Sequence, residues 1–152
     1  MIHWEKNLAE LGLTLPPVAA PVAAYIPAVR TGSLVYTSGQ LPFVNGRLSA
    51  TGKVGAEVAV EAATEAARWC ALNALAAVHD LVGLDAVARV VKVVGFVASA
   101  PGFGDQPMVI NGASELLGRV FGDAGAHARS AVGVSELPKN TPVEVELIVE
   151  VR

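Results

Sequence analysis

The 152-residue sequence has a single cysteine, few aromatic residues and little charge. Cys70 has no second cysteine with which to form a disulfide within the chain, and its helical surroundings are typical of a small core residue rather than a nucleophile. The three histidines form no cluster with it, so we expect no metal site. The net charge of −3 offers no basic surface to a nucleic-acid backbone, so we expect no nucleic-acid partner.

The sequence also lacks a segment that fits a membrane span or a secretion signal. Leu11 to Val29 carries no formal charge, but its four prolines are incompatible with a continuous helix in lipid. The N-terminus has no basic region followed by an apolar core. We therefore expect a cytoplasmic protein without a membrane partner.

Apolar residues are abundant instead, at 53% of the chain, and most of the excess is alanine and valine. Charged residues make up 16%, against about 25% in average proteins. So much apolar surface on one small domain favours self-association. An alanine-rich composition that reflects a GC-rich genome is the alternative explanation.

Hydrophobic periodicity, glycine and proline predict the following elements. They are a short helix over 4–11, an extended proline-rich segment lying across the sheet, and a strand over 33–37 that resumes at 41–44 and turns at Asn45-Gly46 into 47–48. A long helix over 56–82, a turn over 84–87, a strand over 88–98, a loop over 99–107, a helix over 108–121, a turn over 122–125 and strands over 127–134 and 142–151 complete the chain.

This order, β-β-α-β-α-β-β, predicts an α+β fold with a mainly antiparallel sheet and both helices on one face. The other sheet face remains apolar and needs a partner, which again favours an oligomer. An acidic stripe on the long helix, beginning at Glu57 and Glu61, is interpreted as a solvated face.

Common catalytic motifs are missing, including nucleotide-binding loops, zinc-protease motifs and nucleophile elbows. The remaining candidates form a small polar set, namely Tyr25, Ser38, Gly39, Asn111, Arg129 and Glu144. Gly39 lies between two strand-like runs, which indicates a bulge or a close backbone approach. A kinked strand without any ligand is the simpler interpretation of the same pattern.

Arg129 lies within an apolar strand, where a charge is costly unless it is paired or placed in a polar site. Its planar guanidinium can bind both oxygens of a carboxylate at once. Alternatively, Arg129 pairs with Glu144 across adjacent strands as a structural ion pair. The residues alone leave both interpretations open.

Three stretches together resemble the RidA/YjgF family of enamine/imine deaminases. They are Thr37-Ser38-Gly39-Gln40-Leu41-Pro42, Arg129-Ser130-Ala131-Val132-Gly133-Val134, and Leu137-Pro138-Lys139 followed by Val143-Glu144-Val145-Glu146. The resemblance runs from about Tyr25 to the C-terminus. It implies a chorismate-mutase-like fold, a homotrimer with sites in the clefts between subunits, and catalysis without a cofactor.

The resemblance also implies a role for each residue of the polar set. Arg129 matches the arginine that grips the substrate carboxylate, and Glu144 matches the glutamate that positions the hydrolytic water. Ser38 and Gly39 match a substrate-contacting pair, while Tyr25 and Asn111 match a loop tyrosine and an asparagine on the second helix. The implied reaction converts 2-aminoacrylate or 2-iminopropionate into a 2-keto acid and ammonia.

The sequence departs from the family pattern in several places. Ala23-Ala24-Tyr25 replaces Gly-Pro-Tyr, and Ala131 stands where many relatives have cysteine. We expect residues 1–152 to form one RidA-like domain with residues 1–17 as an N-terminal extension, and the 99–107 loop to be longer than usual. Two other functions are a non-catalytic module that binds small carboxylates, and an endoribonuclease or translation inhibitor, against which the acidic composition argues.

Overall fold

The computed structural model describes residues 2–21 and 23–152. In these residues the helices are α1 (Trp4–Glu10), α2 (Val60–Val82) and α3 (Gln106–Phe121), with 3₁₀ turns at Leu84–Ala86, Gly122–Gly125 and Pro138–Asn140. The strands are β1 (Ala28–Thr31), β2 (Leu34–Thr37), β3 (Phe43–Val44), β4 (Arg47–Leu48), β5 (Val87–Ala98), β6 (Ala128–Val134) and β7 (Val143–Val151). No helix in this part of the chain is both long and apolar enough to cross a membrane.

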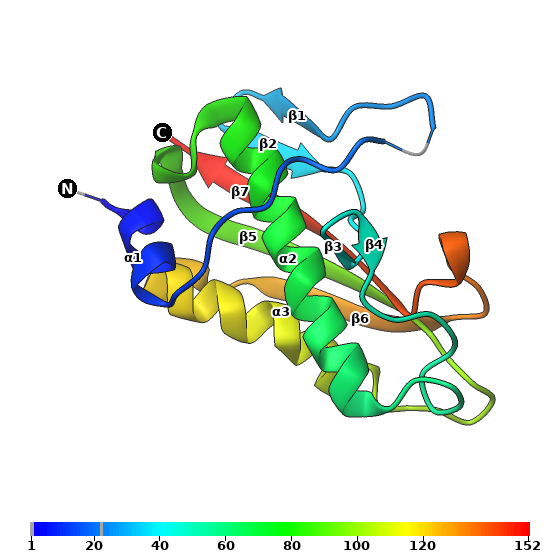
Figure 1. Cartoon of the computed structure of the whole chain (residues 1–152). Helices are drawn as coiled ribbons and strands as arrows, with labels where there is room; N and C mark the ends of the chain where they lie inside the picture. Colours follow the sequence, from blue (N-terminus) through cyan, green and yellow to red (C-terminus); the bar gives the residue numbers. More distant parts are fainter. Residues whose placement is uncertain (1, 22) are drawn as a thin grey trace.

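Five strands form one sheet in the order β1-β2-β7-β5-β6, and β3 and β4 form a separate ribbon. Within the large sheet only β5 and β6 run parallel. Helices α2 and α3 lie side by side over one face of this sheet (Figure 1). The predicted fold class is confirmed, with a mainly antiparallel sheet and two helices on one face.

The first hairpin differs from the prediction. The Asn45-Gly46 turn joins β3 to β4 as expected, because both residues have the positive φ angles, 51° and 80°, that such turns require. However, β3 does not continue β2 in the large sheet, where β2 pairs with β1 on one side and with β7 on the other. The sequence pattern predicts no strand at Ala28–Thr31, because this four-residue strand directly follows the proline-rich segment.

Helix α2 begins at Val60, four residues later than predicted. The backbone amide of Val58 donates to the Lys53 carbonyl, and that of Gly55 donates to the Val58 carbonyl. These bonds close a tight loop and use backbone groups that a helix over these residues would need for its own hydrogen bonds. Gly55 has the positive φ of 92° that the loop requires. The first predicted turn of the helix is therefore replaced by a loop.

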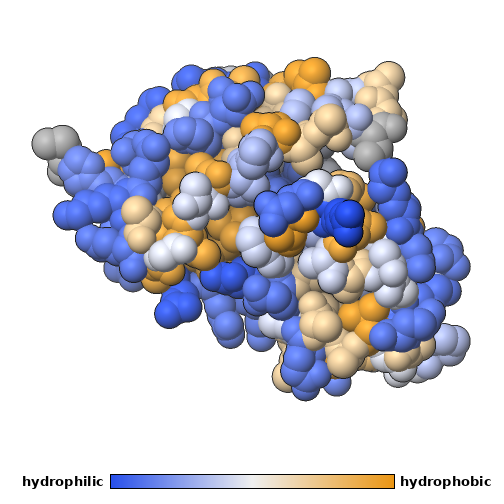
Figure 2. Space-filling model, in the orientation of Figure 1, coloured by the Kyte–Doolittle hydropathy of each residue, from blue (hydrophilic) through white to orange (hydrophobic). Residues whose placement is uncertain are grey.

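From Cys70 to Val78 every residue of α2 is buried, because the helix is covered on two sides. The sheet and α3 lie on one side, and the N-terminal segment crosses the other. Its Leu13 and Leu15 pack on the core, so it lies across α2 and not across the sheet as predicted. Apolar patches remain visible where this segment crosses α2 (Figure 2).

The sheet face away from the helices, here called the open face, carries every second residue of β7. Val143, Val145, Leu147, Val149 and Val151 are buried towards the helices, and the alternate residues, beginning with Glu144, lie on the open face. Three apolar side chains of this open face, Val29, Tyr36 and Val132, are 50%, 43% and 44% exposed in the single chain. A face of this kind is typical of a surface that a partner covers.

Gly112 on α3 allows the close approach of α2. A Cβ atom at Gly112 would meet the backbone carbonyl of Thr64, with the carbonyl carbon at 2.9 Å. We predict that Gly112→Ala lowers the free energy of unfolding by about 1–3 kcal/mol, because the two backbones must move apart. Gly118→Ala, on the same helix with no heavy atom within 4 Å, is the control and raises stability by up to about 1 kcal/mol. Urea unfolding at one fixed protein concentration measures both, and equal midpoints would contradict the prediction.

Candidate functional site

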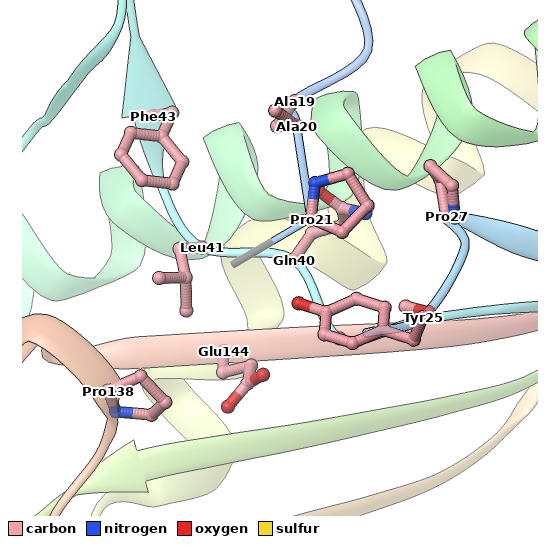
Figure 3. Close-up of a pocket in the computed structure, with 12 residues that line it drawn as sticks. Ala19, Ala20, Pro21, Tyr25, Pro27, Gln40, Leu41, Phe43, Pro138 and Glu144 are labelled. Carbon is pink, nitrogen blue, oxygen red and sulfur yellow. The ribbon is translucent and has the colours of Figure 1, made fainter. Parts of the chain in front are cut away.

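The six predicted site residues fall into two separate groups in the chain. Tyr25, Ser38, Gly39 and Glu144 line one cleft of about 380 Å³, which we call the glutamate cleft (Figure 3). Asn111 and Arg129 lie elsewhere, where α3 covers the edge strand β6, and we call this place the arginine edge. The structure thus brings the predicted residues together in two clusters and not in one.

The glutamate cleft lies where the pairing of β2 with β7 is interrupted. The backbone amide of Leu147 donates to Thr37 Oγ1 at 2.9 Å, and regular pairing resumes where Gln40 and Val145 exchange backbone hydrogen bonds. Ser38 and Gly39 lie between these contacts and leave the strand register. The predicted irregularity at Gly39 is confirmed.

Gly39 is also a place of close approach, and the group that approaches is the side chain of Glu144. A Cβ atom at position 39 would meet the Glu144 carboxylate, with the carboxyl carbon at 2.9 Å. The carboxylate therefore packs on the backbone of the bulge, and a larger residue at position 39 would make it move.

Ser38 fastens the loop that carries Tyr25. Its backbone amide donates to the Pro27 carbonyl at 2.8 Å, and its hydroxyl donates to the Ile26 carbonyl at 2.6 Å. The ring of Tyr25 reaches into the cleft from the side opposite Pro138 (Figure 3). Ser38 thus sets where Tyr25 lies, and its oxygen can still accept a hydrogen bond.

One wall of the glutamate cleft is apolar, and the buried side-chain amide of Asn73 holds it in place. Leu41 and Phe43 form this wall, and the side-chain nitrogen of Asn73 on α2 donates to both of their carbonyl oxygens at 3.0 and 3.1 Å. Asn73 is only 2% exposed. Sequence reasoning missed it, because an asparagine within an alanine-rich helix carries no signal of its distant partners.

Glu144 is half-buried on the open face. Burial raises the pKa of its carboxyl, and the negative charge of Glu146 on the same strand raises this pKa further. A carboxylate with a raised pKa is a better proton acceptor than an exposed one. The cleft therefore contains one group that is suited to activate water.

Arg129 is held by neutral oxygens along α3. Its Nη1 donates to Asn111 Oδ1 at 2.8 Å and to Ser114 Oγ at 3.2 Å, and its Nη2 donates to the Pro107 carbonyl at 3.3 Å. Among the described residues, no carboxylate forms an ion pair with this guanidinium. Three of its five N–H donors are used, which leaves two for another group.

The alternative of a structural ion pair between Arg129 and Glu144 is wrong within one chain. Strand β5 lies between β6 and β7, so the two residues are not on adjacent strands. Arg129 stands in register with the buried Val93, on the helix face, whereas Glu144 is on the open face. The sheet itself keeps the two charges apart.

Ser114 is a second partner of Arg129 that sequence reasoning missed. It follows Asn111 by three residues on α3, and residues three apart lie on one side of a helix. The predicted helix over 108–121 already places Ser114 on the same side as Asn111. The sequence therefore identifies Ser114 as a neighbour once Asn111 is taken as a site residue.

Cys70 is fully buried, as expected of a core residue. Burial raises the pKa of its thiol, and the charge of Glu144 raises it further, so the thiol stays protonated and unreactive. In the described part of the chain, no three His, Cys, Asp or Glu side chains lie close enough together to hold a metal ion.

The contact between Gly39 and Glu144 can be tested by a double-mutant cycle. We predict that Gly39→Ala costs about 0.5–1 kcal/mol of unfolding free energy, because the new methyl group makes the flexible Glu144 side chain move its carboxylate away. In a Glu144→Ala background the same substitution costs clearly less, since the displaced group is gone. Additive effects in urea unfolding of the four proteins would show that Glu144 does not occupy this space.

Comparison with known proteins finds a matching family and similar proteins that cover most of the chain. The model of a family described as "YjgF/chorismate_mutase-like, putative endoribonuclease" matches residues 5–151, which include all of α1 but its first residue, and the proline-rich segment. Protein TCP17 of Trypanosoma cruzi is 45% identical over 146 residues, which cover 95% of this chain and 91% of that protein.

Two further relatives add a named activity and a solved structure. The 2-iminobutanoate/2-iminopropanoate deaminase of Escherichia coli is 33% identical over 129 residues, which cover 85% of this chain and 88% of that enzyme. The crystal structure of a protein of unknown function from Agrobacterium tumefaciens has a TM-score of 0.90 at 48% identity, and the match covers 98% of this chain and 92% of that one.

Proposed function

Because the chain belongs to the RidA/YjgF family, we propose that it hydrolyses small carboxylate-bearing enamines and imines of the 2-aminoacrylate and 2-iminopropanoate type. The products are a 2-keto acid and ammonia, and no cofactor takes part. The observation that carries the proposal is Arg129, a fixed guanidinium with two unused N–H donors and no acidic partner in the described chain. Such a group is suited to bind a carboxylate through two hydrogen bonds.

The active site in this proposal is shared between subunits of a homotrimer. The glutamate cleft of one subunit faces the arginine edge of the next, and three such contacts close a ring. The separation of Arg129 from Glu144 within one chain supports this arrangement. The apolar side chains on the open face support it as well, because association would bury them.

The proposed chemistry needs few groups because the substrate is already reactive. Arg129 binds the carboxylate and fixes the imine carbon near Glu144. Tyr25 and Ser38 line the space that the substrate occupies. Glu144 accepts a proton from water as the water oxygen bonds to the imine carbon. The nitrogen takes up the proton held by Glu144 and then the proton of the new hydroxyl group. The C–N bond breaks, ammonia leaves, and the carbon becomes the keto carbon. Orientation and charge neutralisation supply the acceleration.

Kinetics of two variants test these roles with 2-iminopropanoate generated in situ from alanine by an amino acid oxidase. We predict that Arg129→Ala lowers kcat/KM roughly 100-fold, since a charged, two-pronged contact is lost. Glu144→Gln lowers kcat with little change in KM, because the proton acceptor is lost and the carboxylate contact remains. Glu65→Gln, which removes an exposed carboxylate paired with Arg68 on α2, is the control and keeps full activity.

The pH dependence follows from the state of Glu144, which must be ionised to accept a proton. Its pKa is raised, so activity falls as the pH is lowered through this pKa, and the fall begins at a higher pH than an exposed glutamate would give. The acidic limb disappears in Glu144→Gln. An unchanged acidic limb in this variant would assign the limb to another group.

Mixing two inactive variants tests the shared site. In trimers of Arg129→Ala and Glu144→Gln subunits, a complete site forms wherever an intact cleft meets an intact arginine edge. Random mixing of equal amounts restores about a quarter of the wild-type sites, since each half has an even chance of being intact. Light scattering should give three times the 15.6 kDa subunit mass. Mixed trimers without any recovered activity would contradict a site between subunits.

The same assays separate this proposal from other functions. A non-catalytic module would be stabilised by pyruvate through Arg129 without accelerating imine hydrolysis. A ribonuclease would retain and cleave RNA at low salt, for which the net charge of −3 is unfavourable.

A further inference from the structure

His127 and Ser114 form a hydrogen-bonded chain behind Arg129, and the direction of each bond can be assigned. Nδ1 of His127 lies 2.6 Å from the Gly125 carbonyl oxygen, which can only accept, so Nδ1 carries the hydrogen. In the neutral imidazole Nε2 then has none and must accept. It lies 2.9 Å from Ser114 Oγ, so the serine hydroxyl donates to it.

The direction of the serine hydroxyl determines what its oxygen offers to Arg129. Because its hydrogen points to His127, Ser114 Oγ turns its lone pairs to Nη1 of Arg129, 3.2 Å away. With His127 neutral, donation runs one way, from Arg129 to Ser114, from Ser114 to His127, and from His127 to the Gly125 carbonyl. Bonds aligned in this way polarise one another and strengthen together.

The β6 segment and helix α3 hold this chain of hydrogen bonds between them. His127 precedes Arg129 by two residues, so both side chains are on the same side of the β6 segment, towards α3. Pro107, Asn111 and Ser114 are spaced by four and three residues, so they form one stripe of α3. Each contact to Arg129 comes from this stripe, and only Ser114 links the stripe to His127.

We infer that Ser114 and His127 are positioning residues, which hold the guanidinium of Arg129 with its two unused donors directed at the substrate carboxylate. This inference rests on the proposed function of Arg129. Without Ser114 the guanidinium keeps two of its three contacts, those to Asn111 and to the Pro107 carbonyl, and it turns more freely about its side-chain bonds. Binding of the carboxylate must then also fix the arginine side chain, which costs conformational entropy. The affinity for the substrate therefore falls, while the chemistry at Glu144 is unchanged.

The kinetic test compares variants that break or keep the chain. We expect Ser114→Ala to raise KM for 2-iminopropanoate about tenfold with kcat nearly unchanged, and Ser114→Thr, which keeps the hydroxyl, to restore KM. His127→Asn is long enough to reach the Gly125 carbonyl but not Ser114, so it should behave like Ser114→Ala. His127→Gln places an acceptor at the former Nε2 position and should stay near wild type. In an Arg129→Ala background, Ser114→Ala should have no further effect.

A second measurement requires no substrate and separates failure of this inference from failure of the proposed function. Nitrogen-15 NMR of the wild-type protein at neutral pH should show His127 protonated at Nδ1 and bare at Nε2, and Ser114→Ala should shift the Nε2 signal. A hydrogen on Nε2, or an equal loss of kcat and kcat/KM in Ser114→Ala, would overturn the inference. If the wild-type protein shows the expected tautomer but hydrolyses no imine, the proposed function fails and the hydrogen-bonded chain stands.

Discussion

The alternation of side chains along β7 and β5 is the constraint on which the rest of the structure depends. Because successive residues of a strand point to opposite faces, the row that contains Glu144 cannot share a side with the row that contains Arg129. The helix face becomes a dry core of valine and leucine, and the open face keeps its charges among half-exposed apolar groups. A register slip of one residue would exchange the two rows and bury three glutamates of β7. The register therefore fixes the fold and the separation of the two site clusters at the same time.

Helix α3 connects the core to the arginine edge. One side of the helix comes so close to α2 at Gly112 that a methyl group has no room there. A neighbouring side carries Asn111 and Ser114, which hold Arg129. Since the helix is rigid, its close contact with α2 also determines where its polar stripe meets β6. Core packing and the position of a solvent-facing cation are thus set by the same sixteen-residue helix.

The sequence predicted the elements that are long and periodic, and failed where distant contacts decide. Helix α2, strand β5 and the final strand were found within a few residues, because their burial patterns are local. Strand β1 was missed, since its only sheet partner is β2 and the preceding prolines hide it. The bulge at Gly39 was predicted, but not the carboxylate that fills the space beside it. An ion pair between Arg129 and Glu144 is a plausible interpretation from sequence, because their strands follow one another along the chain. In the sheet, however, β5, which comes earlier in the chain, lies between these two strands.

The two clusters have complementary charges. In one chain Glu144 is partly removed from water beside Glu146, which raises its pKa, and Arg129 is tied only to neutral oxygens. In the proposed trimer the two groups face each other across a subunit contact, where a carboxylate substrate offsets the arginine charge and water occupies the space beside the glutamate. Ligand and assembly then stabilise each other, because the ligand binds the assembled site and not the single chain. In this proposal neither cluster forms a site by itself, because the sheet keeps Glu144 and Arg129 of one chain apart.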